Sequence, residues 1–430
     1  MVKKIILAIV LIGSFVLVVH NASTYPYNAG YDAGLHLKYA DIISQDWRIP
    51  TFAETRENYN PPLFYLVSGL VGRSFGYQVW QYVNVLLALV SLWLWYLVFG
   101  KLHPKDKIIP LVSVALVFSW PVFHKTIVMF SLETFFMFTT ALGFWYFVTH
   151  FQGKTSLKKA IVLALIVVIN LLTRMPGIIL ALTITAGMIG LGIKSKIAWG
   201  KISKFLAVFW LLLIVFTSWF YLGRNSEEVY GVGEGGEVDK PFFQRQPLSF
   251  YFDIPFKFMM TYPMRQNLPL NKMIPIYYSE FWGDFWNYYP QPRFGLSISE
   301  VRKNRELSNE PRIKSLVLQN QVNLLPTLLM VAGFVYLLLK NLNKKFVLPE
   351  AMMVAFAILT WLGFLSLLTK YPSWKSDSVK ASYMLYALPI FGYATSLLVF
   401  QFLKKYRLLF IPSVVMLVLA AIVNLTWSWF

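Results

Sequence analysis

Long apolar runs separated by short polar segments alternate along most of the chain. A membrane-spanning helix needs about 20 mostly apolar residues. Eleven runs approach this length: 4–20, 79–99, 108–124, 127–149, 159–173, 176–193, 205–222, 322–340, 348–369, 383–403 and 408–428. The pattern predicts an all-α polytopic membrane protein with about eleven transmembrane helices, of which 108–124 and 159–173 are short for a full crossing.

The composition excludes several other classes of protein. The chain is 57% hydrophobic and 14% charged, whereas a soluble domain carries about 25% charged residues. Its 17% aromatic content is atypical of disordered chains. It has no cysteine, which excludes disulfides, thiolate metal sites and cysteine nucleophiles. No small-x-small cleavage pattern follows the first apolar run, so this run is interpreted as an uncleaved anchor rather than a signal peptide.

The basic residues predict the orientation of the chain. Lys and Arg cluster in the short segments 100–107, 150–158, 194–204, 341–347 and 404–407. Because cytoplasmic loops carry an excess of Lys and Arg, we expect these segments and the N-terminus to be cytoplasmic in a cell membrane. The net charge of +19 is spread over these clusters rather than gathered on one soluble face, so no nucleic acid partner is expected.

Two long segments are then external, 21–78 and 223–321, and together they hold sixteen of the twenty acidic residues. Acid–base chemistry is therefore expected at the outer face. The predicted organisation is an N-terminal transmembrane module (1–222) that includes the first external segment, a large external region (223–321) and the C-terminal transmembrane helices (322–430).

The first external segment contains a predicted helix from Asp32 to Ser44 with a polar face. Asp32, His36 and Tyr39 recur at helical spacing and share one side of this helix. The apolar remainder of the helix suits a position on the membrane surface. An alternative interpretation is an N-cap aspartate, favoured by the helix dipole, with a surface histidine.

The order of residues in this segment resembles a known family. A Gly-Tyr-Asp triplet ending at Asp32, a histidine four residues later, a glutamate and the sequence Pro-Pro-Leu-Phe-Tyr over 61–65 resemble the first external loop of GT-C glycosyltransferases. The branch resembled contains the protein O-mannosyltransferases and the aminoarabinose transferase of lipid A. The resemblance implies a polyprenyl-phosphate sugar donor, a glycan, lipid or protein acceptor, contact with membrane lipids, and Asp32 as the catalytic residue. Ala33 departs from the Asp-Glu pair of the mannosyltransferases, so neither the sugar nor the acceptor is specified.

The implied chemistry suits these residue types. Sugar transfer passes through an oxocarbenium-like state, and an acceptor hydroxyl needs a positioned base, for which Asp32 is the candidate. His36 can orient Asp32, contact the acceptor or bind a metal with it, but two ligands make a weak site. A divalent metal stays open, and no metal ligands or other cofactors are assigned. Glu57 is the candidate second carboxylate, ahead of Glu54.

Two further charged residues adjoin apolar runs at the outer face. A carboxylate inside the membrane is costly unless it faces a cavity or a partner. Glu133 is therefore either a glutamate that reaches the membrane interface or a residue that lines the sugar site from below. Arg174 is either an interfacial anchor or a cation for the lipid phosphate, which a guanidinium fits well.

The last external turn adds a basic residue and a tyrosine. GT-C relatives carry such a pair at the start of the following span, and Lys380 with Tyr383 matches it. This resemblance implies that the two hold the leaving phosphate. Lys370 and Lys375 are assigned instead to lipid headgroups.

The second external segment contains an aromatic stretch over 277–286. It is either an interfacial belt or a sugar platform around Trp282, with Glu280 and Asp284 accepting hydroxyl groups. A Trp-Gly pair is frequent in this loop of GT-C relatives, which favours the site.

The function predicted is a membrane glycosyltransferase, and the main alternative is a transporter or flippase. A transporter buries ionisable residues or breaks its helices near the bilayer midplane, whereas the ionisable residues here collect at one face. A structural membrane subunit is a third possibility. An outer cleft lined by both Asp32 and Lys380 would indicate the enzyme.

Overall fold

The structure is a computed structural model, and it describes a defined part of the chain: residues 2–151, 156–195, 198–224, 246–261, 263–264, 272–286, 288, 311–342, 347–370 and 378–429. Within these ranges the regular elements are all helices, with no strand. The predicted all-α class is therefore confirmed.

Eight helical stretches within the described residues are long and apolar enough to cross a membrane, which supports a multi-pass membrane protein. They comprise α1 (Val2–Thr24), α4 (Tyr77–Leu102), α9 (Gly177–Ser195), α10 (Trp199–Tyr221), α18 (Pro311–Val322) continued by α19 (Leu324–Leu342), α20 (Leu348–Lys370), the helix over 381–405, and α22 (Arg407–Trp427).

Three of the eleven predicted runs form shorter or less apolar helices outside this set. The run 108–124 is divided into α5 (Ile108–Phe118) and α6 (Pro121–Thr126). Trp120 is extended there, as the residue before a proline tends to be. The other two runs form α7 (Glu133–His150) and α8 (Leu157–Leu171). The figure of eleven spans therefore stays a prediction.

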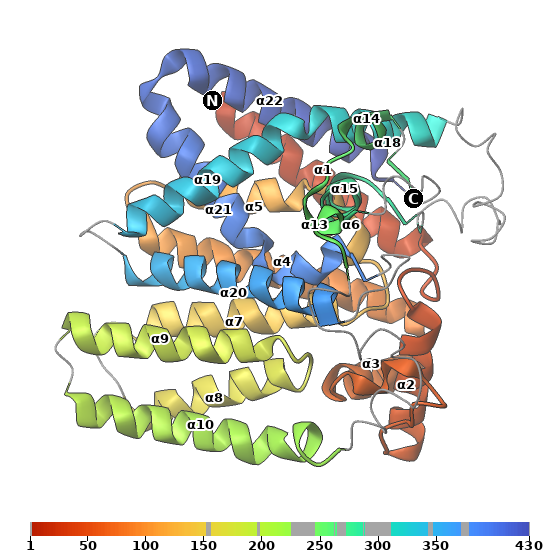
Figure 1. The fold of residues 1–430 in the computed structure, drawn as a ribbon, viewed down its shortest axis with the longest axis vertical. Helices are drawn as coiled ribbons and strands as arrows, with labels where there is room; N and C mark the ends of the chain where they lie inside the picture. Colours follow the sequence, from red (N-terminus) through yellow and green to blue (C-terminus); the bar gives the residue numbers. More distant parts are fainter. Residues whose placement is uncertain are drawn as a thin grey trace.

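Figure 1 shows the long helices side by side, with the short helices of both predicted external segments at their right-hand end. The first external segment forms α2 (Ala33–Asp46), the 3-10 helix η1 (Arg56–Tyr59) and α3 (Leu63–Phe75). The second contributes α13 (Leu248–Phe252), α14 (Phe256–Thr261) and α15 (Met273–Trp282). The helices predicted beside the membrane in the first external segment are confirmed, while much of 223–321 lies outside the described residues.

The helix over 381–405 runs through the middle of the bundle, and 89% of its apolar window is buried. It changes from a 3-10 helix, η4 (Ala381–Ala387), to α21 (Leu388–Leu397), then to a π-helical turn, η5 (Leu398–Phe402), and ends in η6 (Leu403–Lys405). Gly392 packs on the Ser113 carbonyl of α5, where a side chain would clash. Such close packing on small residues holds this helix in place and brings its first turn to the end where α2 lies.

Candidate active site

The start of α2 places Asp32 in an unusual conformation. Gly30 has φ 111°, and a Cβ there would press on the side chain of Met129, so glycine fits this position best. Asp32 follows in the left-handed region with φ 52° and occupies the N-cap position, but its side chain makes no capping hydrogen bond to the helix. The carboxylate is therefore available to another partner.

That partner is Lys380, 348 residues further along the chain. Its Nζ donates to Oδ2 of Asp32 at 2.5 Å. The Lys380 side chain is 10% exposed and that of Asp32 is 41% exposed. The ammonium also lies 5.1 Å from the ring centre of Tyr31 and 5.6 Å from that of Tyr383, within the range of a cation–π attraction. Lys380 is thus held at the bundle end by two rings and one carboxylate.

The ion pair keeps both groups charged. Burial raises the pKa of Asp32, but the charge of Lys380 and its hydrogen bond outweigh this, so the pKa of Asp32 falls below its ordinary value. Burial lowers the pKa of Lys380, yet Tyr383 and Asp32 more than compensate and raise it well above the usual range. A carboxylate with a lowered pKa is a weaker base than a free aspartate.

A second cation faces the same tyrosine. Arg174, in the turn between α8 and α9, has its Cζ 4.5 Å from the ring centre of Tyr383. Its Nη1 donates to Oε1 of Glu133 at 3.0 Å. The structure thus brings four of the predicted site residues, Lys380, Tyr383, Arg174 and Glu133, together with Asp32.

His36 and Glu57 form a neighbouring pair one helical turn from Asp32. Nδ1 of His36 lies 2.8 Å from the Tyr65 hydroxyl and 3.7 Å from Oε2 of Glu57. Both side chains are buried, so the alternative of a surface histidine is wrong. Asn60 donates to Oε2 of Glu57 at 2.5 Å. Glu57 therefore returns to the polar face of α2, as a second carboxylate would need to.

Glu54, the alternative to Glu57, is engaged elsewhere. Both of its oxygens accept from Arg48, at 2.7 and 2.8 Å. This bidentate pair is partly exposed, and its Arg48 follows the C-terminal end of α2, whereas Asp32 precedes the first residue of that helix.

Glu280 and Trp282 occupy different positions from those expected of a sugar platform. Glu280 is 0% exposed and Trp282 is 2% exposed, so protein covers both side chains. Glu280 pairs with the buried Lys125 of α6, and Trp282 donates its Nε1–H to Thr327 at 2.7 Å. These contacts fasten α15 to the bundle behind the site.

One further contact joins this buried cluster to the candidate site. Nε1 of Trp286 donates to the carbonyl of Val379 at 3.0 Å, immediately before Lys380. The second external segment therefore positions Lys380 from behind, through the backbone.

Sequence reasoning missed three participating residues: Tyr31, Tyr65 and Lys125. Two of them stand inside the quoted motifs, as the middle residue of Gly-Tyr-Asp and the last of Pro-Pro-Leu-Phe-Tyr. A tyrosine ring can attract a cation and its hydroxyl can bond to a histidine, so these two tyrosines could have been recognised in the sequence as site residues. Lys370 and Lys375 cannot be compared, because the side chain of Lys370 and all of 371–377 lie outside the described residues.

In the part of the chain that the structure describes, the side chains around Asp32 do not offer the ligand set of a divalent metal ion. Lys380 occupies the carboxylate of Asp32, and a cation would have to displace it. Among the described residues, no three His, Asp or Glu side chains converge as metal ligands. No step of the chemistry below is therefore routed through a metal.

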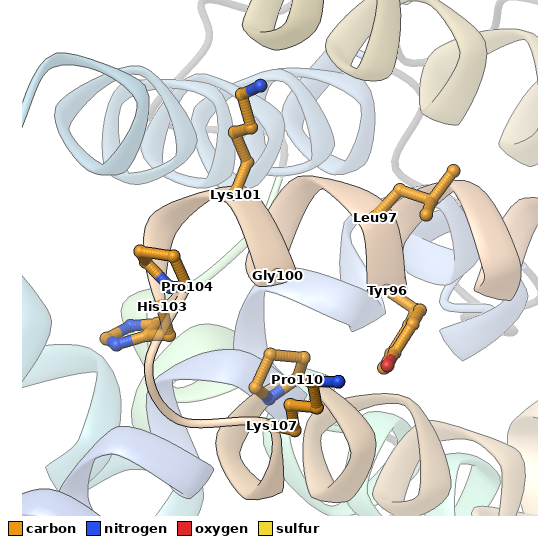
Figure 2. Close-up of a pocket in the computed structure, with 8 residues that line it drawn as sticks. All are labelled: Tyr96, Leu97, Gly100, Lys101, His103, Pro104, Lys107 and Pro110. Carbon is orange, nitrogen blue, oxygen red and sulfur yellow. The ribbon is translucent and has the colours of Figure 1, made fainter.

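A hollow of about 440 Å³ lies at the far end of α4. α4 has 26 residues, a length of about 39 Å, and its first residue, Tyr77, bonds to Asp41 of α2. The hollow is lined by Tyr96, Leu97, Gly100, Lys101, His103, Pro104, Lys107 and Pro110. Figure 2 shows Lys101 pointing away from Lys107 and Pro110, so these lysines do not converge on one ligand.

Comparisons with known proteins concern the fold. No protein-family model matches the chain. No curated protein sequence matches it either. Among solved structures, the chain is similar to the oligosaccharyltransferase of Archaeoglobus fulgidus in its apo form, with a TM-score of 0.54 and 14% sequence identity over 99% of this chain and 56% of that one.

Two further solved structures resemble the chain. The archaeal oligosaccharyltransferase AglB from Archaeoglobus fulgidus, in complex with an inhibitory peptide and a dolichol-phosphate, gives a TM-score of 0.51 at 15% identity, over 100% of this chain and 56% of that one. ArnT from Cupriavidus metallidurans in the apo state gives 0.39 at 15% identity, over 92% of this chain and 77% of that one.

This chain therefore spans about half the length of the archaeal enzyme. The likeness extends over nearly all of its own length, so it concerns the whole helical bundle rather than one motif. The chain therefore shares the fold of this archaeal oligosaccharyltransferase, which agrees with the GT-C-like fold expected from the motifs of its first external segment.

Proposed function

We propose that this protein transfers a sugar from a polyprenyl-phosphate donor to an acceptor hydroxyl at the outer membrane face, with Asp32 as general base. One observation carries the proposal: the partly exposed carboxylate of Asp32 meets Lys380 at 2.5 Å. Arg174 shares the Tyr383 ring with Lys380, so a base and two phosphate-binding cations lie together.

The reaction assigns a role to each group. Asp32 takes the proton from the acceptor hydroxyl as its oxygen bonds to the anomeric carbon. The bond from that carbon to the phosphate oxygen breaks, and its electron pair leaves with the polyprenyl phosphate. Lys380 and Arg174 stabilise the growing negative charge on the phosphate, and the Tyr383 hydroxyl can donate to it.

The remaining predicted residues support this geometry. Glu133 holds the Arg174 guanidinium at 3.0 Å and so keeps it directed at the Tyr383 ring. His36 and Glu57 lie beside the start of α2, where they orient Asp32 and offer hydrogen bonds to the acceptor. Glu280 and Trp282 act indirectly, by holding the segment that supports Lys380.

The fold likeness supports the class of donor. The archaeal oligosaccharyltransferase of the same fold has been solved with a dolichol-phosphate, which is a polyprenyl phosphate. For the acceptor, only the chemical group is proposed, a hydroxyl on a glycan, lipid or protein, because this chain covers only 56% of that enzyme.

The distribution of basic residues supports an external site. Lys380 precedes the first turn of the helix over 381–405, and Lys404 and Lys405 end it. Lys101 and Lys105 lie at the end of α4 that is remote from α2. If these clusters are cytoplasmic, as the positive-inside rule requires, Asp32 and Lys380 face outward. A transporter would instead place its charged groups near the bilayer midplane.

The test is the substitution Asp32→Asn. Asn keeps the size of the side chain and tolerates the left-handed conformation, but it cannot accept a proton at neutral pH. Transfer should fall by about 100- to 10,000-fold, measured as loss of the glycan that mass spectrometry detects on cells with the wild-type gene.

Asp46→Asn is the matched control, because it removes a carboxylate at the other end of the same helix. Full restoration of the glycan by a folded Asp32→Asn protein would refute the role of Asp32, and Glu57 would become the next candidate base.

A further inference from the structure

Three buried or half-buried cations near the candidate site each hold a carboxylate: Lys380 with Asp32, Arg174 with Glu133, and Lys125 with Glu280. The pairs differ in how far solvent reaches the acid. The exposed fraction of the carboxylate side chain is 41% for Asp32, 8% for Glu133 and 0% for Glu280. Of the three acids, Asp32 is therefore the one that solvent reaches most, and its pair is the one that an anion arriving from outside can open most readily.

We propose that Lys380 exchanges partners during the reaction, bonding to Asp32 in the resting protein and to the donor phosphate once the donor is bound. This inference rests on the proposed function. A lysine suits such an exchange, because its ammonium is a point charge on a flexible four-carbon stem. The rings of Tyr31 and Tyr383 lie 5.1 and 5.6 Å from the ammonium and continue to stabilise it while it moves.

The exchange makes the base depend on the donor. In the resting pair, one oxygen of Asp32 is occupied and its pKa is lowered, so it is a poor proton acceptor. When the donor phosphate takes Lys380, this oxygen becomes free and the stabilisation of the charged carboxylate is lost. Asp32 then gains basicity only while a donor is present.

The same movement resets the site. After transfer, Asp32 carries the proton of the acceptor hydroxyl, and the phosphate has changed from a diester with one negative charge to a monoester with up to two. When the polyprenyl phosphate leaves, Lys380 returns to Asp32. Its positive charge again lowers the pKa of the carboxyl and releases the proton to solvent.

The proposal predicts an unusual effect on binding. If Asp32 competes with phosphate for Lys380, Asp32→Asn should bind undecaprenyl phosphate about tenfold more tightly than the wild type, because a charge-assisted hydrogen bond no longer has to be broken. Affinity is measured on purified protein in detergent. Asp46→Asn should leave the affinity unchanged, and undecaprenol, which lacks the phosphate, should not distinguish the variants.

A double-mutant cycle separates exchange from simple charge repulsion. In a Lys380→Gln background, Asp32→Asn should give a gain of less than about twofold, since no lysine is left to release. An equal gain in both backgrounds would overturn the exchange, as would equal affinity of the wild type and Asp32→Asn.

A failure of the proposed function would give a different binding result from a failure of the exchange. If neither the wild type nor any variant binds undecaprenyl phosphate, while thermal melting shows that all are folded, the donor class is wrong and the exchange falls with it. Binding by the wild type that Asp32→Asn leaves unchanged refutes the exchange alone.

Discussion

The aromatic ring of Tyr383 lies beside two cations that come from distant parts of the chain. Its ring centre lies 4.5 Å from the Arg174 guanidinium and 5.6 Å from the Lys380 ammonium. Two like charges near one another repel, and here Glu133 and Asp32 compensate for that repulsion. A bound phosphate would replace the negative charge of Asp32 in balancing the positive charge of Lys380.

Arg174 should therefore matter for the donor more than for the chemical step. We expect Arg174→Ala to raise the KM for the polyprenyl-phosphate donor about 10- to 100-fold, the equivalent of about 1.5–3 kcal/mol for a charge-assisted contact. Steady-state kinetics with varied donor concentration measure this. Lys272→Ala, which removes a cation paired with Asp253 in the second external segment, is the control; an equal effect of both would show that only the overall charge matters.

The Lys125–Glu280 pair should contribute chiefly to folding. Lys125→Met leaves the fully buried Glu280 without its cation, which costs about 3–5 kcal/mol when one partner of a buried ion pair is removed. The double variant with Glu280→Gln should recover part of this loss, because residue 280 is then neutral; the recovery is only partial since the buried Asp284, 4.0 Å from Nζ of Lys125, still loses this cation. Thermal melting in detergent measures both variants, and a double variant less stable than Lys125→Met would contradict this account.

At the scale of the elements, the site depends on how closely α2 lies against α3. Gly69 of α3 faces the Ala40 carbonyl and the Ser44 side chain of α2, where a Cβ would clash. Arg73 of α3 donates to the Ser44 carbonyl at 2.5 Å, and the Tyr39 hydroxyl donates to the Asn60 carbonyl at 3.1 Å. These contacts fix the axis of the helix that begins at Asp32.

Adding one methyl group tests this packing. Gly69→Ala should destabilise the protein by about 1–3 kcal/mol, as overpacking does, and reduce transfer by shifting the start of α2. Gly34→Ala is the matched control within α2, since a Cβ there meets nothing within 4 Å. It should stabilise the helix by about 0.5–1 kcal/mol. The melting temperatures of the two variants should move in opposite directions, and only Gly69→Ala should lower the transfer rate. A Gly69→Ala protein with unchanged stability and transfer would refute the close fit.

At the scale of the whole molecule, the proposal depends on the orientation of the bundle. The chain has no cysteine, so a thiol reagent can label this protein only at a cysteine that is introduced. A cysteine at the exposed Gln45, at the end of α2, should react with a membrane-impermeant thiol reagent in intact cells. One at the exposed Lys105, between α4 and α5, should react only after the membrane is opened. Labelling of Lys105→Cys in intact cells would reverse the orientation.

Much of the bundle could be predicted from local pattern alone. Apolar runs of membrane-spanning length define helices, because a backbone in lipid must satisfy its own hydrogen bonds. The helix after Asp32, and the Gly-Tyr-Asp and Pro-Pro-Leu-Phe-Tyr motifs, are equally local. The break at Trp120 and Pro121 was missed, since the apolar run continues through it although Pro121 cannot donate a backbone hydrogen bond.

Tertiary structure alone decided which charges meet. The Asp32–Lys380 pair spans 348 residues, and no periodicity along the chain relates two positions so far apart. The burial of Glu280 and Trp282 likewise follows from the packing of α15 beside α6, because an aromatic and acidic stretch suits a surface platform as well as a buried support. Helix positions follow from short-range hydrogen bonding and hydropathy, whereas ion pairing and side-chain exposure depend on how the whole bundle closes around each group.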